Sequence, residues 1–134
     1  MSSSDPDTSA PCPCGLGSPY AECCGPIHDG RPAPTATQLM RSRYSAFALG
    51  LSEYLLRSWH VSTRPVSLEL DNDTRWLRLI IESAEQGGPF DTGGTVTFAA
   101  IGRTPEGRFE QRERSSFVRE GGDWFYVSGA EPQP

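Results

Sequence analysis

Residues 35–50 read TATQLMRSRYSAFALG, and this stretch decides how the middle of the chain folds. Thr35, with Gln38 three residues later, forms a capping box that is typical of a helix N-terminus. Gly50 favours a stop, because glycine readily ends a helix. The apolar residues between them recur at helical spacing: Ala36, Leu39, Met40, Tyr44, Phe47 and Ala48. The stretch therefore predicts an amphipathic helix with one face on a core.

Arg43 stands on the apolar stripe of this helix, between Leu39 and Phe47. A guanidinium does not lose its charge on burial, so it needs partners inside the protein. Glu113, on what we expect to be the inward face of a later strand, is the natural candidate. The alternative is that Arg43 extends to the rim of the core and keeps its charge in water.

Upstream of the helix, the four cysteines of the chain fall in one short window: Cys12, Cys14, Cys23 and Cys24. Zinc takes four soft donors at about 2.3 Å, and a C-x-C pair and a C-C pair supply them if the loop between turns back. Residues 15–22 contain two glycines and a proline, which favour such a turn. We therefore predict a Zn²⁺ site with all four cysteines as ligands. A closed four-thiolate site has no open position for substrate, so this zinc would be structural.

Two alternatives to the four-cysteine site stay open at this point. His28 could replace one cysteine in a Cys₃His set, although a lone histidine near a glycine-rich end is more typical of a solvent-facing residue or of one that supports the ligands. The thiols could also be free or a redox pair, or form disulfides in an oxidising compartment.

Downstream of the helix, a second short helix is expected over Ser52–Trp59. From Thr74 onward the apolar pattern changes to period two, which predicts strands. Four strands are expected, at about residues 75–86, 95–103, 109–119 and 123–128. Helices followed by an antiparallel meander predict an α+β domain, with two or three helices packed on one face of a curved four-stranded sheet.

The faces of two strands carry further predictions. In the first strand Leu77, Leu79 and Ile81 share one face, which places Trp76 and Ile80 on the opposite, outer face. In the third strand Gln111, Glu113, Ser115 and Phe117 share a face, and Phe117 suggests that this face turns inward.

Length and composition narrow the class of protein. The chain has 134 residues, the size of one domain with a small appendage. Its N-terminus has neither a basic start nor an apolar stretch, as a secretory signal would, and no run approaches the roughly 18 apolar residues of a spanning helix. We therefore expect a cytoplasmic protein with no membrane segment. A formal net charge of −5 argues against DNA as a partner, because an acidic chain attracts nucleic acid only weakly.

The cysteine segment resembles a known zinc-binding module. Cys12-Pro13-Cys14-Gly15, Tyr20 and Cys23-Cys24-Gly25 are similar to the SEC-C motif found at the C-terminus of the bacterial preprotein translocase motor SecA. The last ligand in SecA is usually histidine, and Cys24 stands at that place here. SEC-C motifs usually also carry lysines that help to contact ribosomes or partner proteins, whereas this chain has no lysine.

Nearly the whole chain, from Cys12 to about Gly129, resembles the bacterial YchJ family. The segments that carry the resemblance are Leu39–Phe47, Tyr54-Leu55, Ser58–His60, Glu113-Arg114-Ser115-x-Phe117 and Trp124-x-Tyr126-Val127-x-Gly129. This resemblance implies an N-terminal SEC-C motif followed by a nuclear-transport-factor-2-like cone, and it carries no particular activity with it. The domain organisation that we expect is a disordered tail over 1–10, the SEC-C motif and linker over 11–34, the cone over 35–129 and a tail over 130–134.

A curved sheet packed against helices leaves a pocket at its open end, and four residues are candidates to line it: Arg43, Tyr44, His60 and Glu113. Two functions follow from them. The first is a protein- or ribosome-interaction or small-ligand-binding module with structural zinc. The alternative is an isomerase- or dehydratase-like enzyme, in which Glu113 or His60 acts as base and Arg43 as electrostatic partner. The outer sheet face, with Trp76 or Ile80 exposed, is a candidate homodimer surface.

Overall fold

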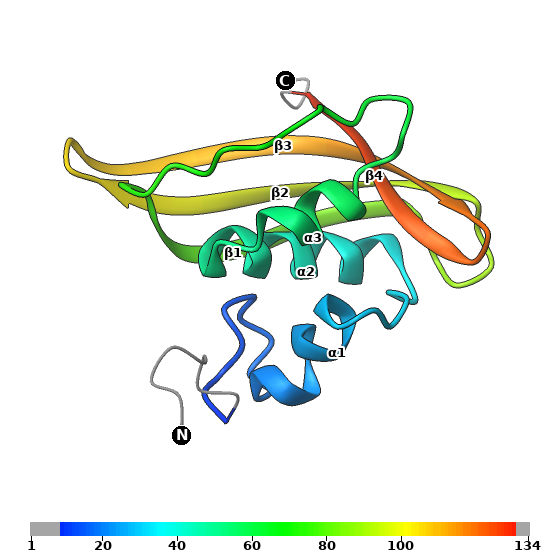
Figure 1. The fold of residues 1–134 in the computed structure, drawn as a ribbon, viewed down its shortest axis with the longest axis horizontal. Helices are drawn as coiled ribbons and strands as arrows, with labels where there is room; N and C mark the ends of the chain where they lie inside the picture. Colours follow the sequence, from blue (N-terminus) through cyan, green and yellow to red (C-terminus); the bar gives the residue numbers. More distant parts are fainter. Residues whose placement is uncertain (1–8, 131–134) are drawn as a thin grey trace.

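The computed structural model describes residues 9–130 (Figure 1). The expected disordered tails, 1–10 and 130–134, lie almost wholly outside the described residues. The described residues run through a cysteine-containing segment with one short helix, then two further helices and four strands.

The main helix, α2, spans Ala36–Leu49 and confirms the prediction from the capping box. The backbone N–H of Gln38 donates to the Thr35 hydroxyl at 3.1 Å, and Gly50 ends the helix in the left-handed region at φ 76°. The next helix, α3, spans Ser52–Arg57 and is two residues shorter than expected.

The strands form one antiparallel sheet in the order β1-β2-β3-β4, which confirms the predicted meander. Their bounds are β1 Arg75–Gln86, β2 Gly93–Thr104, β3 Gly107–Glu120 and β4 Asp123–Ala130. Helices α2 and α3 lie against one face of this sheet (Figure 1). The core between them contains Leu39, Met40 and Tyr44 from α2 and Leu79, Val96, Phe98, Phe117 and Trp124 from the sheet.

The predicted facing of β1 was wrong at its start. A β-bulge lies between Trp76 and Arg78, so that Leu77 is the extra residue and pairs with no residue of β2. An extra residue shifts the alternation of faces by one position. As a result Leu77 is 44% exposed, whereas Trp76 turns inward and packs against the core.

The N-terminal segment contains a short 3₁₀ turn, η1 (Tyr20–Glu22), and the five-residue helix α1 (Cys24–His28). It lies on the side of the helices away from the sheet (Figure 1). Ile27 packs against the core cluster of the sheet and against the smaller cluster around Leu55. The segment therefore packs on the domain.

Candidate metal centre and cone pocket

The segment around the cysteines folds back on itself. Cys12 donates its backbone N–H to Ser18 at 2.9 Å, and Gly15 donates to the carbonyl of Cys12 at 3.1 Å. Gly15 and Gly17 both adopt positive φ, of 86° and 95°, which costs glycine little. This tight loop brings the C-x-C pair next to the C-C pair at the start of α1.

The sulfur atoms of Cys12, Cys14, Cys23 and Cys24 all lie within 4.8 Å of one another. None of these cysteines is in a disulfide, and the Sγ atoms of Cys14 and Cys23 are 3.5 Å apart. Four sulfurs bound at about 2.3 Å to one tetrahedral ion would be about 3.8 Å apart, so these donors are close enough to hold one metal ion. We call this group of four thiols the knuckle cluster.

The electrostatics of the knuckle cluster favour a cation. Hydrogen bonds from Cys14 and Cys24 lower the pKa of Cys12, and the same interaction with Cys12 raises the pKa of Cys24. One thiolate therefore makes the next ionisation unfavourable in a buried site. A divalent cation at the centre would offset the repulsion between the thiolates and allow all four groups to ionise.

The outer face of α2 holds the knuckle cluster. The Ser45 hydroxyl lies 3.2 Å from Cys24 Sγ, to which it donates, and 3.4 Å from Cys12 Sγ. Arg41 donates to the carbonyl of Cys14 at 3.2 Å. Sequence reasoning missed both residues, because an α2 side chain meets a cysteine only in the folded protein.

His28 is neither a cluster ligand nor solvent-facing. It is buried, with Nδ1 2.6 Å from the Tyr20 hydroxyl and Nε2 2.8 Å from the carbonyl of Ser42 on α2. Burial lowers the pKa of His28, so the neutral ring is favoured. Of the two expectations for a non-ligating His28, the solvent-facing one was wrong, because α1 lies directly against α2. Its contact with Tyr20, which packs against the cysteines, fits the other expectation, a residue that supports the ligands.

On the opposite face of α2, between the helix and the sheet, lies a cavity of about 240 Å³. We call it the cone pocket. Its walls include six aromatic side chains: Tyr44, Phe47, Trp59, Trp76, Phe98 and Tyr126. Its polar lining consists of Arg43, Gln111, Glu113 and Ser115. Three of the four predicted pocket residues thus line it, namely Arg43, Tyr44 and Glu113.

Arg43 is buried, at 3% exposed, but the expected ion pair with Glu113 is not among the contacts of residues 9–130. Its Nη1 donates to the carbonyl of Leu55 at 2.8 Å and to the Ser58 hydroxyl at 2.6 Å. The guanidinium carbon lies 4.4 Å from the ring centroid of Tyr126 and 5.2 Å from that of Trp59. The last carbonyls of a helix lack intrahelical partners, and at the end of α3 such a carbonyl is close enough to accept from the Arg43 guanidinium. Arg43 therefore bonds to α3 and not to Glu113. Burial lowers the pKa of Arg43 to about 10.

Glu113 and Ser115 are among the polar groups of the cone pocket that have no hydrogen-bond partner within the described part of the chain. The Glu113 carboxylate is half-buried and makes no ion pair there. The Ser115 hydroxyl, on a side chain 1% exposed, is also unpartnered. The inward face predicted for this part of β3 is confirmed, because Glu113 and Ser115 both line the pocket and Phe117 is in the core.

His60, the fourth predicted residue, lies outside the lining of the cone pocket. Its Nε2 is 2.5 Å from a carboxylate oxygen of Glu120, and its Nδ1 is 2.7 Å from the Ser62 hydroxyl. Its backbone N–H donates to Tyr126 at 2.7 Å, which fixes the chain after α3 alongside β4. Sequence reasoning did not identify Trp59, Trp76 and Tyr126 as pocket residues. For Trp76 the reason is the bulge, because it places this residue on the face opposite to the one that simple alternation predicts.

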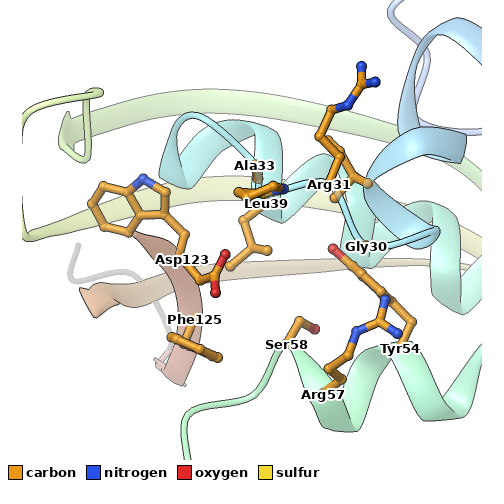
Figure 2. A pocket seen from close by; sticks show the side chains of 12 residues that line it. Gly30, Arg31, Ala33, Leu39, Tyr54, Arg57, Ser58, Asp123 and Phe125 are labelled. Carbon is orange, nitrogen blue, oxygen red and sulfur yellow. The ribbon is translucent and has the colours of Figure 1, made fainter. Parts of the chain in front are cut away.

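A second cavity, of about 230 Å³, lies where the linker after α1 meets α3 and β4. Figure 2 shows Asp123 and Phe125 on one side of it and Tyr54 and Arg57 on the other. The indole N–H of Trp124, which also lines this cavity, is buried without a partner among residues 9–130.

On the outer face of the sheet, ion pairs between β3 and β1 span the intervening strand β2. Arg112 on β3 pairs with Glu82 on β1 at 2.7 Å, and Arg114 pairs with Glu85 at 3.2 Å. Trp76, one of the two residues expected to be exposed for a homodimer, is on the inner face.

Among the helices of the described residues, none has the length and apolar character needed to cross a membrane.

This architecture defines a SEC-C motif followed by a domain like nuclear transport factor 2, and comparisons with known proteins agree. The SEC-C motif matches residues 9–26, and the YchJ middle NTF2-like domain matches residues 35–129. The chain belongs to the YchJ family, whose curated relatives carry the name UPF0225 protein.

Two such relatives show how much of the chain is shared. The one from Chromobacterium violaceum is 49% identical over 125 residues, which cover 90% of this chain and 92% of the relative. The one from Deinococcus radiodurans is 45% identical over 123 residues, which cover 90% and 89%.

Two solved structures of SEC-C motif containing proteins have the same fold. The solution structure from Rhodopseudomonas palustris has a TM-score of 0.81 at 30% identity, and covers 92% of this chain and 100% of that one. The crystal structure from Psychrobacter arcticus has a TM-score of 0.74 at 26% identity, with coverage of 95% and 85%.

Proposed function

We propose that this protein is a small-ligand-binding module in which a structural zinc ion braces the binding pocket. One observation carries the proposal: α2 serves both sites. Its inner face supplies Arg43 and Tyr44 to the cone pocket, whereas its outer face holds the knuckle cluster through Arg41 and Ser45. The metal would therefore fix the position of the helix that forms one wall of the pocket.

Zinc is the ion that the four-thiolate donor set suits best. Tetrahedral sulfur sites select zinc or iron–sulfur chemistry, and four cysteines on one compact cluster are typical of structural zinc. All four thiols would be occupied, so the ion would stabilise the fold and take no part in a reaction. Free thiols also fit the cytoplasmic location that the sequence predicts.

Native mass spectrometry of protein purified without chelator tests both parts of the proposal. We expect one zinc ion per chain and, in a fraction of the molecules, a bound small molecule. Cys14→Ser should lose the zinc, and it should also lose the small molecule because α2 is no longer braced. Zinc-free protein that still folds and still retains a ligand would refute the bracing role.

A cone-fold enzyme is the second candidate, because the unpaired Glu113 carboxylate lies in an aromatic pocket that also contains Arg43. In this case Glu113 would take a proton and Arg43 would stabilise the developing negative charge. A Glu113→Gln variant that folds and binds ligand but no longer converts it would favour the enzyme. The protein or ribosome partner and the homodimer stay predictions.

A further inference from the structure

We propose that the cone pocket selects an uncharged, planar nitrogen heteroaromatic ligand of one or two rings, bound with N–H donors toward Glu113 and a ring carbonyl toward Arg43 or Ser115. This inference rests on the proposed ligand-binding function and names the class of ligand.

The charges of the lining carry the first step. Among residues 9–130, Arg43 and Glu113 are the two charged residues that line the pocket, and they have opposite signs. A cationic ligand would meet the buried guanidinium, and an anionic ligand would meet the half-buried carboxylate. In a site of low dielectric constant, this repulsion offsets the attraction to the opposite charge of the lining, so a net charge gains little in return for the hydration that it loses. The lining therefore favours a ligand without net charge.

The unsatisfied polar groups carry the second step. An ionised carboxylate only accepts hydrogen bonds, so Glu113 favours a ligand that has N–H groups. Two N–H groups side by side would bind both carboxylate oxygens. On the same face of β3, two residues along, the buried Ser115 hydroxyl has no hydrogen-bond partner in the described part of the chain. The hydrogen bonds of Arg43 within residues 9–130 use Nη1 alone, so its other N–H groups are available to a carbonyl. A ring with an amino–imino edge and a carbonyl satisfies all of these groups.

The shape of the pocket carries the third step. Six aromatic side chains make its walls, and flat ligands gain most from contact with ring faces. A volume of about 240 Å³ is below the 300–1,000 Å³ that is usual for ligand pockets. One or two fused rings fit this space.

A zwitterion, such as a free amino acid, also has no net charge, and the same lining disfavours it. Its two charges would lose their hydration and would need full pairing in return. Arg43 has only its Nε–H and Nη2–H groups left for a carboxylate, and Glu113 is left for the ammonium, so one partner for each charge offsets only part of the lost hydration. An uncharged ring has a much smaller desolvation cost.

The test measures binding of defined probes to the zinc-loaded full chain by saturation-transfer NMR and calorimetry. The probes are isocytosine and pterin for the proposed class, benzamidinium for a planar cation, L-phenylalanine for a zwitterion and toluene for an apolar ring. We expect isocytosine or pterin to bind at least about tenfold more tightly than the other three.

Two variants make the test specific to the lining. Glu113→Gln should weaken isocytosine binding by about tenfold, since removing the charge of the acceptor costs about that much. Glu110→Gln is the matched control, because this residue lies on the same strand, is exposed and does not line the pocket. It should leave binding unchanged. Circular dichroism checks that both variants are folded.

The outcomes separate this inference from the proposed function. Preferential binding of L-phenylalanine or benzamidinium would overturn the ligand class and would leave the binding function intact. Equal binding of toluene, insensitive to Glu113→Gln, would do the same. Failure of all five probes would also overturn the class; if native mass spectrometry then found no small molecule bound, the proposed function would fail as well.

Discussion

Replacing Arg43 by methionine should lower the free energy of unfolding by about 3 kcal/mol. The change removes two charged hydrogen bonds, to Leu55 and Ser58, and the stacking on Tyr126 and Trp59. At about 2 kcal/mol for each bond and for the stacking, the loss is about 6 kcal/mol. Burial lowers the pKa of Arg43 from 12.5 to about 10, and removing this desolvated charge returns about 3 kcal/mol.

Urea unfolding of zinc-loaded protein at pH 7.5 measures the difference, with Glu113→Gln as the control. Glu113 makes no ion pair or hydrogen bond among residues 9–130, so the control should stay within about 0.5 kcal/mol of the wild type. If instead Glu113 neutralised Arg43, its substitution would cost about 3–5 kcal/mol. The reasoning is refuted if Glu113→Gln destabilises as much as Arg43→Met, or if Arg43→Met costs less than about 1 kcal/mol.

Ser45→Ala should cost about 1–2 kcal/mol in zinc-loaded protein and at most half of that after chelation. Zinc makes Cys24, the acceptor of this hydroxyl, a thiolate, whereas without metal its raised pKa leaves it a neutral thiol and a weaker acceptor. An equal cost in both states, measured by thermal unfolding, would contradict this. Gly94→Ala should cost at least about 3 kcal/mol of stability, since its Cβ would lie 2.5 Å from backbone atoms. Gly93→Ala is the control and should cost much less, because the nearest atom to its Cβ would be 3.7 Å away. Denaturant midpoints compare the two variants, and similar losses would refute the close backbone contact at Gly94. Burial lowers the pKa of His28, so the unfolded chain binds more protons than the folded one and stability falls as the pH drops below about 6.5. In His28→Gln, at equal zinc occupancy, the free energy of unfolding should depend less steeply on pH between 7.5 and 6. The same pH dependence in variant and wild type would contradict the burial of a neutral His28.

Sequence alone determined the local elements of this protein, because their signals lie within a few residues of one another. The capping box at Thr35 and the stop at Gly50 define α2, and the period-two alternation defines four strands. The cysteine spacing likewise predicts the knuckle cluster, since a short loop with two glycines and a proline favours a turn that brings the two pairs together. The inward face of β3 followed from alternation, and with it the placement of Glu113 in the pocket.

Only the tertiary structure decided how these elements meet. The bulge at Leu77 arises from pairing with β2, so the inward turn of Trp76 has no signal in the local pattern. Arg43 bonds to Leu55 and Ser58 because the end of α3 packs closer to it than β3 does. The two sides of α2, one on the thiols and one on the pocket, likewise depend on contacts between residues far apart in the chain. Hydrophobic periodicity reports which side of an element is buried, but the partner on that side is selected by packing of the whole domain.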